Sequence, residues 1–417
     1  MHKNAKAAQG YVLTTLFLDV LCFGLVLPVL PGLISELTGG TLSKASVYGG
    51  WLMFTFSVAQ FLMAPALGKL SDRFGRRRLL LLSLFGIGID YLLLGFATGI
   101  GWLFAGRLLA GASNTTFYTA TAYTADVTIP EERAKRFGLL GAAFGLGITI
   151  GPVLGGELSE FGIRFPFYAA FALTLLNWLY TYFVVPESLP GLNQSAFTWK
   201  RANPIGALLH LRQYPVVTGL FCSLFCTYIA VHVFHNVWAY FTALKFEWPE
   251  ASIGYSFGLL GLLIALVQGV LTGLVAPRLG AKRTACVGIS LYSLGYLLLG
   301  LASESWMLFA FLLPYAMGGI SEPAIQSILS GEVPETEQGE LQGGVASLAS
   351  ATAVVGAPLM SYFFSFFTSD NAPLYFPEAP FFLAAALTGT SLLIVLRVLS
   401  GFTPKAQKAP AKASAGV

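Results

Sequence analysis

Charged residues are scarce in this chain. Lys, Arg, Asp and Glu together make up 11% of its 417 residues, whereas they make up about 25% of an average soluble domain. The net charge of +4 is small, far from the strongly basic balance that is typical of nucleic acid binding. Because 55% of the residues are hydrophobic, the composition predicts a protein solvated mainly by lipid.

Cysteine and catalytic motifs are equally scarce. The four cysteines lie in apolar runs without the spacing of zinc sites or disulfide frameworks; they are Cys22, Cys222, Cys226 and Cys286. No polar segment carries a nucleotide-binding glycine loop, a catalytic triad or a cluster of metal ligands. We therefore expect packing roles for the cysteines, no metal site, no cofactor and no enzymatic activity.

Long apolar runs, in contrast, fill the chain. A bilayer core requires about 20 such residues per helix, and twelve runs begin near Tyr11, Val47, Leu79, Trp102, Arg136, Phe165, Pro215, Ser252, Arg283, Trp306, Gly339 and Phe381. The first run, at 11–33, is too long for a signal peptide and has no small-residue cleavage site. We predict an all-α membrane protein with twelve transmembrane helices and both termini on one side.

Basic residues indicate which side this is. Lys44, Arg164 and Lys245 fall in loops of the opposite side, and Arg107 falls inside a run. The remaining 20 of the 24 Lys and Arg residues lie at the termini or in the loops on their side. The positive-inside rule therefore predicts that both termini are cytoplasmic.

The two halves of the chain repeat each other. The sequence Tyr-Leu-Leu-Leu-Gly occurs at 91–95 and again at 296–300, a shift of 205 residues. The same shift pairs Gly68 with Gly273, Gly75 with Gly280, Gly138 with Gly343 and Gly151 with Gly356. A shift of six helices indicates parallel repeats related by an axis along the membrane normal. We predict six-helix domains at 1–185 and 215–403, a cytoplasmic linker at 186–214 and a disordered cytoplasmic tail at 404–417.

Recurrent motifs stand on this framework. Residues 68–78 read GKLSDRFGRRR, with five cations, one carboxylate and two glycines between apolar runs, and a degenerate copy at 273–283 reads GLVAPRLGAKR. Helix 4 contains Arg107 and Gly111, and helix 5 contains Gly147, Gly151, Pro152, Gly155 and Gly156. The first stretch resembles motif A of the major facilitator superfamily at every position. The others resemble the second copy of motif A, motif B, and the motif C of proton-driven exporters.

Within this family the chain is most similar to the tetracycline-efflux branch, on the stretches GLVLPVLP at 24–31, SDRFGRR at 71–77 and IDYLLL at 89–94. The resemblance implies alternating access and proton-coupled export of amphipathic small molecules or drugs across a bacterial inner membrane. We expect a monomer whose partners are the bilayer, its substrate and protons from the gradient. Tetracycline exporters carry a His in helix 8 and an Asp in helix 9, where this chain has Ile264 and Tyr292. These departures weaken the case for a metal–tetracycline chelate as substrate.

Three ionisable residues are predicted inside the membrane. Asp19 and Asp90 lie about eight and eleven residues into their helices, or about 12 and 17 Å at the helical rise, near the middle of a ~30 Å core. A carboxylate there must be paired, protonated or hydrated, and Arg107 must find acceptors because it stays charged. The resemblance implies a proton-coupling role for Asp19, Asp90 and Arg107. The alternative is a structural pair between Arg107 and a helix-1 or helix-3 acid.

A substrate cavity is predicted between the halves. Glu322 interrupts apolar helix 10, and Gln326 lies one turn further on the same face. This carboxylate has three possible roles: to bind a cationic substrate, to carry a proton, or to form a helix–helix hydrogen bond. The candidate cavity residues are Tyr118, His232, Asn236, Trp238, Glu322 and Gln326.

The basic stretch at 68–78 is predicted to form a conformational latch. Its candidate residues are Gly68, Asp72, Arg73, Gly75, Arg76 and Arg77. In the family the matching Asp meets the start of helix 11, which here carries Glu335, Glu337 and Glu340. These acids are expected to face the arginines and to hold the inward mouth shut in the outward-open state. The alternative is a simple topology anchor.

Two rival functions remain open from the sequence. One is an uptake symporter or facilitator of a small metabolite, which the glycine–proline motif of helix 5 disfavours. The other is a non-transporting receptor or scaffold on the same fold, which would show no counterflow.

Overall fold

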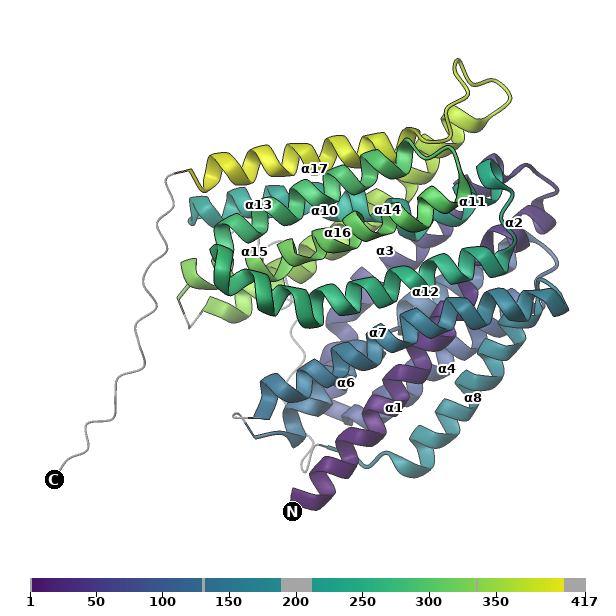
Figure 1. The fold of residues 1–417 in the computed structure, drawn as a ribbon. Coiled ribbons are helices and arrows are strands. Elements are labelled where there is room, and N and C mark those ends of the chain that lie inside the picture. Colours follow the sequence, from purple (N-terminus) through teal and green to yellow (C-terminus); the bar gives the residue numbers. More distant parts are fainter. Residues whose placement is uncertain (1, 130–131, 189–211, 335–336, 401–417) are drawn as a thin grey trace.

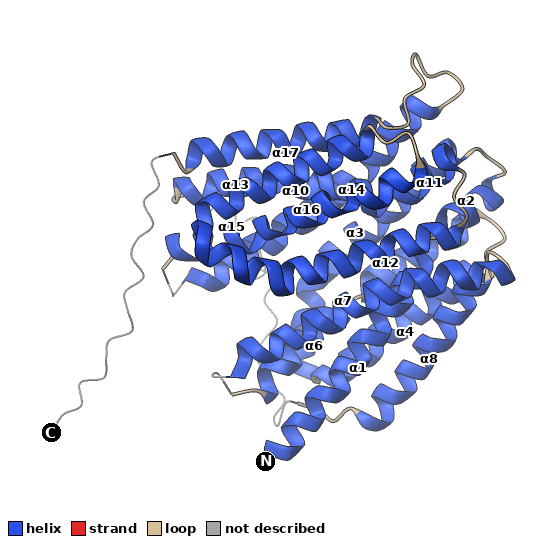
Figure 2. Cartoon of the chain, in the orientation of Figure 1, coloured by secondary structure: helices blue, strands red, loops and turns tan. Residues whose placement is uncertain are grey.

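The structure is a computed structural model that describes residues 2–129, 132–188, 212–334 and 337–400. Helices joined by short loops make up these ranges, and no strand occurs in them (Figure 2). The predicted tail at 404–417 and most of the predicted linker at 186–214 lie outside the described residues.

The N-terminal half consists of α1 (His2–Val26), α2 (Leu30–Thr38), α3 (Leu42–Phe74), α4 (Arg76–Gly95), α5 (Ile100–Ser113), α6 (Thr116–Val127), α7 (Arg133–Leu158), η2 (Ser159–Phe161) and α8 (Phe165–Val184). The C-terminal half consists of α10 (Pro215–Asn236), α11 (Trp238–Phe246), α12 (Glu250–Leu266), η4 (Val267–Leu271), α13 (Thr272–Gly300), α14 (Ser305–Met317), η5 (Gly318–Ile320), α15 (Ser321–Glu332), α16 (Gln338–Thr368) and α17 (Ala379–Val398).

These helices form the twelve predicted spans. In the described part of the chain, ten helical stretches are long and apolar enough to cross a membrane. One of them, at 250–300, has 51 residues and would be about 77 Å long if straight, more than twice the bilayer core. It turns back at Gly280 and counts as two spans. The missing span is α5 with α6, which are individually short because the helix is interrupted at Asn114 and Thr115.

The internal repeat is visible in the backbone. Gly75, between α3 and α4, has φ 98°, and Gly280, 205 residues later, has φ 75°. Such positive φ angles favour glycine, which has no Cβ to clash with the backbone. The break between α5 and α6 likewise corresponds to η5, which separates α14 from α15. The prediction of two parallel six-helix repeats is confirmed.

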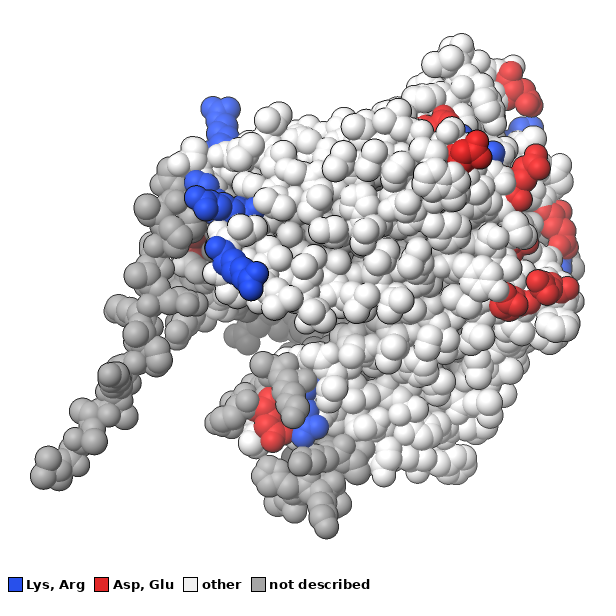
Figure 3. Space-filling model, viewed as in Figure 1, with Lys and Arg blue, Asp and Glu red and all other residues white. Residues whose placement is uncertain are grey.

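The two halves lie side by side and meet at one end (Figure 1). We call the end where α1 begins and α17 ends the terminal face, and the opposite end the distal face. Across the halves, α3 packs on α16 and α7 packs on α12. Figure 1 shows the halves diverging toward the terminal face. In the view of Figure 3, most Lys and Arg side chains gather at the terminal face and most Asp and Glu side chains at the distal face.

Small residues close the distal face. The hydroxyl oxygens of Ser43 in α3 and Ser365 in α16 lie 3.2 Å apart, and Ser46 donates to the Ser361 carbonyl at 3.4 Å. At Gly156 in α7, an added Cβ would lie 2.6 Å from the Glu250 carbonyl oxygen. The helices of the two halves therefore approach as closely as their backbones allow, which small residues make possible inside a membrane.

Candidate functional site

A buried ion pair lies in the N-terminal half. Arg107 of α5 donates from both Nε and Nη2 to the carboxylate of Asp90 on α4, with Nε 3.2 Å from Oδ1. Asp90 is 1% exposed and Arg107 is 4% exposed. Gly106 leaves room for the pair, since a Cβ there would lie 2.5 Å from Asp90 Oδ1. The two hydrogen bonds from the guanidinium compensate both charges away from water. Of the two acids that the sequence offered as partners for Arg107, on helix 1 and helix 3, the structure selects Asp90 on helix 3.

Asp19 of α1 lies near this pair but is not part of it. Its Oδ1 is buried and has no hydrogen-bond partner among the described residues, while the Thr116 hydroxyl of α6 lies beside the carboxyl group. Tyr91 of α4 is next to Asp90 in the sequence and lies within electrostatic range of both Asp19 and Arg107. A carboxylate that lacks a cation partner in the membrane interior is a candidate for reversible protonation.

A small cavity joins this pair to the C-terminal half. It measures about 40 Å³ and is lined by Arg107 together with His235, Asn236 and Tyr240. Two polar atoms of these side chains, Asn236 Oδ1 and Tyr240 Oη, are buried and without a partner in the described part of the molecule. The volume suits one or two water molecules. The predicted substrate-cavity residue Asn236 therefore borders this small space, and its role stays a prediction.

Two other candidates have different surroundings. Trp238 is 1% exposed and donates from Nε1 to Ser256 Oγ at 2.8 Å. Its ring stacks on Phe234, so it lies in the core of the C-terminal half rather than on a cavity wall. His232 contacts Asn236 through Nδ1 at 3.3 Å and packs against Gly356 of α16. The position of an aromatic residue along a helix does not show whether its ring lies in a packed core or lines a cavity.

A larger cavity opens between the halves toward the terminal face. It measures about 330 Å³, and its walls come from α3, α6 and α16, including Gln60, Tyr118 and Ser347. Tyr118 is 54% exposed and lines this space. Gly68, Ser71 and Arg76 also border it. A space of this size is large enough for a drug-sized molecule.

The glycines of α7 form two contact faces. Gly147, Gly151 and Gly155 recur every four residues and all face α1. Gly156 and the carbonyl group of Pro152 face α12 of the other half, whereas the Pro152 ring faces Gly24 of α1. The predicted helix-5 motif is thus a thin wedge between α1 and α12, at the distal closure of the two halves.

We expect Gly151→Ala to impair both stability and transport. The added Cβ would lie 2.6 Å from the Leu21 carbonyl oxygen and 2.8 Å from Gly24 Cα, and neither backbone atom can rotate away. Overpacking of this kind costs about 1–3 kcal/mol. Thermal melting of the purified protein and transport in proteoliposomes measure the two effects.

Gly145→Ala is the matched control on the same helix. No atom lies within 4 Å of a Cβ added at Gly145, so melting and transport should match the unmodified protein. Equal behaviour of the two variants would show that close approach of α7 to α1 is not required.

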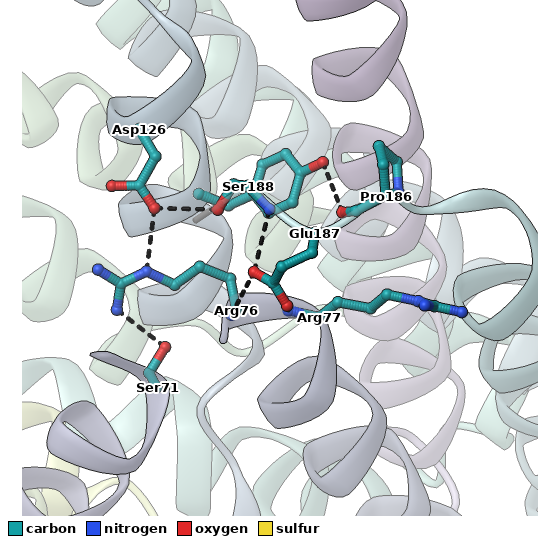
Figure 4. A network of polar contacts seen from close by, with 8 residues as sticks. Ser71, Arg76, Arg77, Asp126, Pro186, Glu187 and Ser188 are labelled. Carbon is teal, nitrogen blue, oxygen red and sulfur yellow. Dashed lines mark hydrogen bonds and ion pairs between the residues drawn. The ribbon is translucent and has the colours of Figure 1, made fainter. Parts of the chain in front are cut away.

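The basic stretch between α3 and α4 is held by a network of polar contacts (Figure 4). The Glu187 carboxylate accepts from the backbone N–H groups of Arg76 at 2.8 Å and Arg77 at 3.2 Å. It therefore caps the positive N-terminal end of α4. Gly75 is favoured here because its φ of 98° lies in a region that residues with a side chain rarely adopt.

Side chains extend the network to α6. Arg76 Nε contacts Asp126 Oδ2 at 3.1 Å, and Arg76 Nη1 donates to Ser71 Oγ at 2.9 Å. Ser188 Oγ donates to the same Asp126 oxygen at 3.0 Å, and Tyr123 donates to the Pro186 carbonyl at 2.9 Å. The start of the predicted linker is thus attached to α4 and α6 (Figure 4).

One predicted partner of this stretch has a contact within its own half. Glu337 accepts from the Tyr214 hydroxyl at 3.0 Å, within the C-terminal half. Glu335 lies outside the described residues, as do the side chains of Asp72 and Glu340. Arg73 lies over the ring of its neighbour Phe74. The latch across the two halves therefore stays a prediction, whereas Asp126 and Glu187 are contacts that sequence reasoning missed.

Glu322 of α15 forms a contact with α10. The Tyr228 hydroxyl donates to Glu322 Oε1 at 2.9 Å, and Gln326 Oε1 is buried without a partner among the described residues. Tyr292 packs its ring against Gly318, just before α15. Ile264, like Tyr292, is partly buried and packs against the hydrophobic core.

The family can now be assigned from comparison with known proteins. The sequence matches the Major Facilitator Superfamily over residues 12–277 and 220–416. The chain belongs to this superfamily. It is 40% identical over 345 residues to the class C tetracycline resistance protein of Escherichia coli, covering 83% of this chain and 86% of that protein. The class B tetracycline resistance protein of Escherichia coli is 33% identical over 412 residues, which cover 99% of this chain and 100% of that protein.

Solved structures of Major Facilitator Superfamily members share the fold. The human organic anion transporter MFSD10 (TETRAN) superimposes with a TM-score of 0.69 at 24% identity, covering 94% of this chain and 99% of that chain. A bacterial homologue of the lysosomal transporter Spinster, solved inward-facing and unoccupied, has a TM-score of 0.72 at 14% identity and covers 95% of each chain. The protein is a multi-pass membrane transporter of small molecules and not an enzyme.

Proposed function

We propose that this protein is a proton-coupled antiporter that exports amphipathic small molecules by alternating access. The observation that carries the proposal is Asp19, whose buried Oδ1 has no hydrogen-bond partner and whose carboxylate has no ion-pair partner among the described residues, next to the compensated Asp90–Arg107 pair. The proposal places the chain as a monomer in a bacterial inner membrane, with the proton gradient as its energy source and no bound cofactor.

The direction of transport is inferred from the relatives and from charge. Tetracycline resistance proteins align with 83% or more of the chain, and resistance by a transporter of this fold is best explained by export. Lys and Arg side chains gather at the terminal face (Figure 3), which supports a cytoplasmic position for that face by the positive-inside rule. Both termini are then cytoplasmic, and the 330 Å³ cavity faces the cytoplasm.

Proton binding at Asp19 supplies the coupling. In the outward-facing state, water reaches Asp19 from outside, and one proton binds to a carboxylate oxygen. The neutral carboxyl group is compatible with the dry, closed distal side, whereas the ionised form is penalised there. In the inward-facing state the proton leaves to the cytoplasm, and the ionised carboxylate favours the return with substrate bound.

Asp90 and Arg107 keep a role near this site. Because they form a complete fork, their charges are satisfied inside the N-terminal half. Arg107 also lines the small cavity shared with the C-terminal half. A cation at this place favours ionised Asp19 once water enters, so the pair tunes the coupling group rather than carrying the proton itself.

The glycine wedge of α7 and the network at Arg76 act at opposite ends. The wedge closes the distal side by contact with α12. At the terminal side, we infer that the stretch at 68–78 docks on the start of α16 when the cavity closes, as a latch. The Asp126 and Glu187 contacts hold its backbone in position for that docking.

Everted membrane vesicles with a pH-sensitive dye test the function. After an imposed acid-inside gradient, addition of an amphipathic drug should release protons from vesicles that contain the protein. Vesicles without it should show no release. Drug accumulation without proton movement would point to a facilitator, and protons that move in the same direction as the substrate would point to an uptake symporter.

A further inference from the structure

A cluster of cations lies at the terminal end of the C-terminal half. Arg278 and Arg283 flank the turn at Gly280, and both are exposed. Arg397, in the last turn of α17, is also exposed. Lys282 Nζ donates to a backbone carbonyl just after α17, which brings the turn next to the end of that helix. We call Arg278, Lys282, Arg283 and Arg397 the basic corner.

No carboxylate neutralises the basic corner. None of its four side chains forms an ion pair with an Asp or Glu of the described residues. The corresponding turn of the N-terminal half differs, because Arg76 contacts Asp126 there. The repeat shift of 205 residues aligns the whole of α6 with α15 and places Gly331 where Asp126 stands in the first half. The C-terminal copy of the turn therefore has the cations without the acid.

The basic corner lies on the lipid-facing side of its half. Figure 1 shows α17 at the edge of the C-terminal half that points away from the N-terminal half, and α13 packs against α17. None of the residues that line the 330 Å³ cavity belongs to α13 or α17. In Figure 3, basic side chains gather at the terminal end of this half. The cations are thus directed toward the bilayer rather than toward the substrate path.

Apolar side chains continue from the basic corner along the same helices. Leu393 and Leu396 of α17 are 68% and 47% exposed, and Leu279 beside Arg278 is 38% exposed. The 20 residues of α17 span about 30 Å, which matches the hydrocarbon core. Arg397 in the last turn therefore lies at the depth of the phospholipid headgroups, with a hydrocarbon-facing surface next to it.

We propose that the basic corner binds the phosphate headgroup of an anionic phospholipid, whose acyl chains lie along α13 and α17. Arginine guanidinium groups match phosphate oxygens in charge and geometry, and basic pockets on transmembrane helices bind anionic headgroups in this way. A phosphatidylcholine headgroup fits poorly, because its own cation would face the arginines. The proposal does not depend on antiport, since the lipid can bind without substrate or protons.

Photolabelling of the full chain in phosphatidylcholine bilayers tests this site. The probe is a phosphatidylglycerol with a photoreactive group in its acyl chain, and mass spectrometry should locate the label on α13 and α17. Unlabelled phosphatidylglycerol should suppress the labelling by about fivefold or more, since each basic residue near an anionic lipid adds an attraction of about that size. The same amount of additional phosphatidylcholine should change it by less than about twofold.

A triple variant separates lipid binding from misfolding. Arg278→Gln, Arg283→Gln and Arg397→Gln in one chain should lower the labelling of α13 and α17 by about fivefold or more. Lys282 is retained, so its hydrogen bond to the end of α17 remains, and the melting temperature in phosphatidylcholine should match that of the unmodified protein. Lys44→Gln with Arg212→Gln removes exposed cations elsewhere and should leave the labelling unchanged.

Three results would overturn the proposal. The first is unchanged labelling of the triple variant, and the second is equal suppression by phosphatidylglycerol and phosphatidylcholine. The third is suppression by soluble glycerophosphoglycerol as strong as that by the whole lipid, which would indicate a site for free phosphate esters. Loss of phosphatidylglycerol-dependent labelling in the triple variant, with normal labelling of the control, supports the lipid site.

Discussion

Asp19→Asn is expected to abolish proton-coupled export and to preserve exchange of substrate. Asparagine has nearly the same shape as aspartate but cannot bind or release a proton near neutral pH. The transporter can then still reorient with substrate bound, because a neutral asparagine carries no charge whose burial would penalise either closed state. Proton release in everted vesicles should fall to the level of empty vesicles, while counterflow of labelled substrate continues.

Stability separates this role from a structural one. Asp19 Oδ1 has no hydrogen-bond partner among the described residues, so Asp19→Asn breaks no ion pair with them. The free energy of unfolding should stay the same or increase. A structural role predicts the reverse, a lower melting temperature. Asp370→Asn, in an exposed loop of the distal face, is the control and should leave coupling intact. Coupling that survives Asp19→Asn would remove Asp19 from the mechanism.

Spans and repeat are predictable from this sequence because membrane physics constrains them strongly. A helix must supply about 20 apolar residues to cross the bilayer, and few other patterns produce twelve such runs. The glycine pairs at a shift of 205 residues predict matching turns, and the positive φ angles of Gly75 and Gly280 agree. The interruption of the fourth span at Asn114 and Thr115 has no comparable signal, because neither residue prevents a helix.

The candidate site is only partly predictable. The cost of burying charge identifies Asp19, Asp90 and Arg107 as residues with a special environment. Which acid pairs with Arg107 depends on how the helices rotate against one another, and periodicity does not determine this rotation. Side-chain geometry selects Asp90.

Contacts between distant segments are the least predictable. Glu187 caps α4 from 111 residues away, and on the sequence it is only an acid after an apolar run. Trp238 is predicted to line a cavity but lies in the core, because an aromatic residue at the distal end of a span is compatible with both positions. The distal closure consists of serine and glycine, whose close contacts depend on small size and leave no distinctive motif.

A cysteine pair at the distal closure is expected to block transport reversibly. Ser43 of α3 and Ser365 of α16 belong to different halves, and their hydroxyl oxygens are 3.2 Å apart. In a background without the four native cysteines, Ser43→Cys with Ser365→Cys can form a disulfide after small side-chain shifts. Alternating access requires these helices to separate, so oxidation should reduce transport to background, and reduction should restore it.

A second pair tests whether the block results from joining the halves. Ser223 and Ser391 have hydroxyl oxygens 2.6 Å apart, but α10 and α17 belong to the same half. Because each half moves largely as a rigid body in this mechanism, cross-linking Ser223→Cys to Ser391→Cys should leave transport near that of the cysteine-free background. Full activity of an oxidised Ser43→Cys, Ser365→Cys protein, with cross-linking confirmed by mass spectrometry, would contradict opening at α3 and α16. Substrate would then have to leave by a route that keeps these helices together.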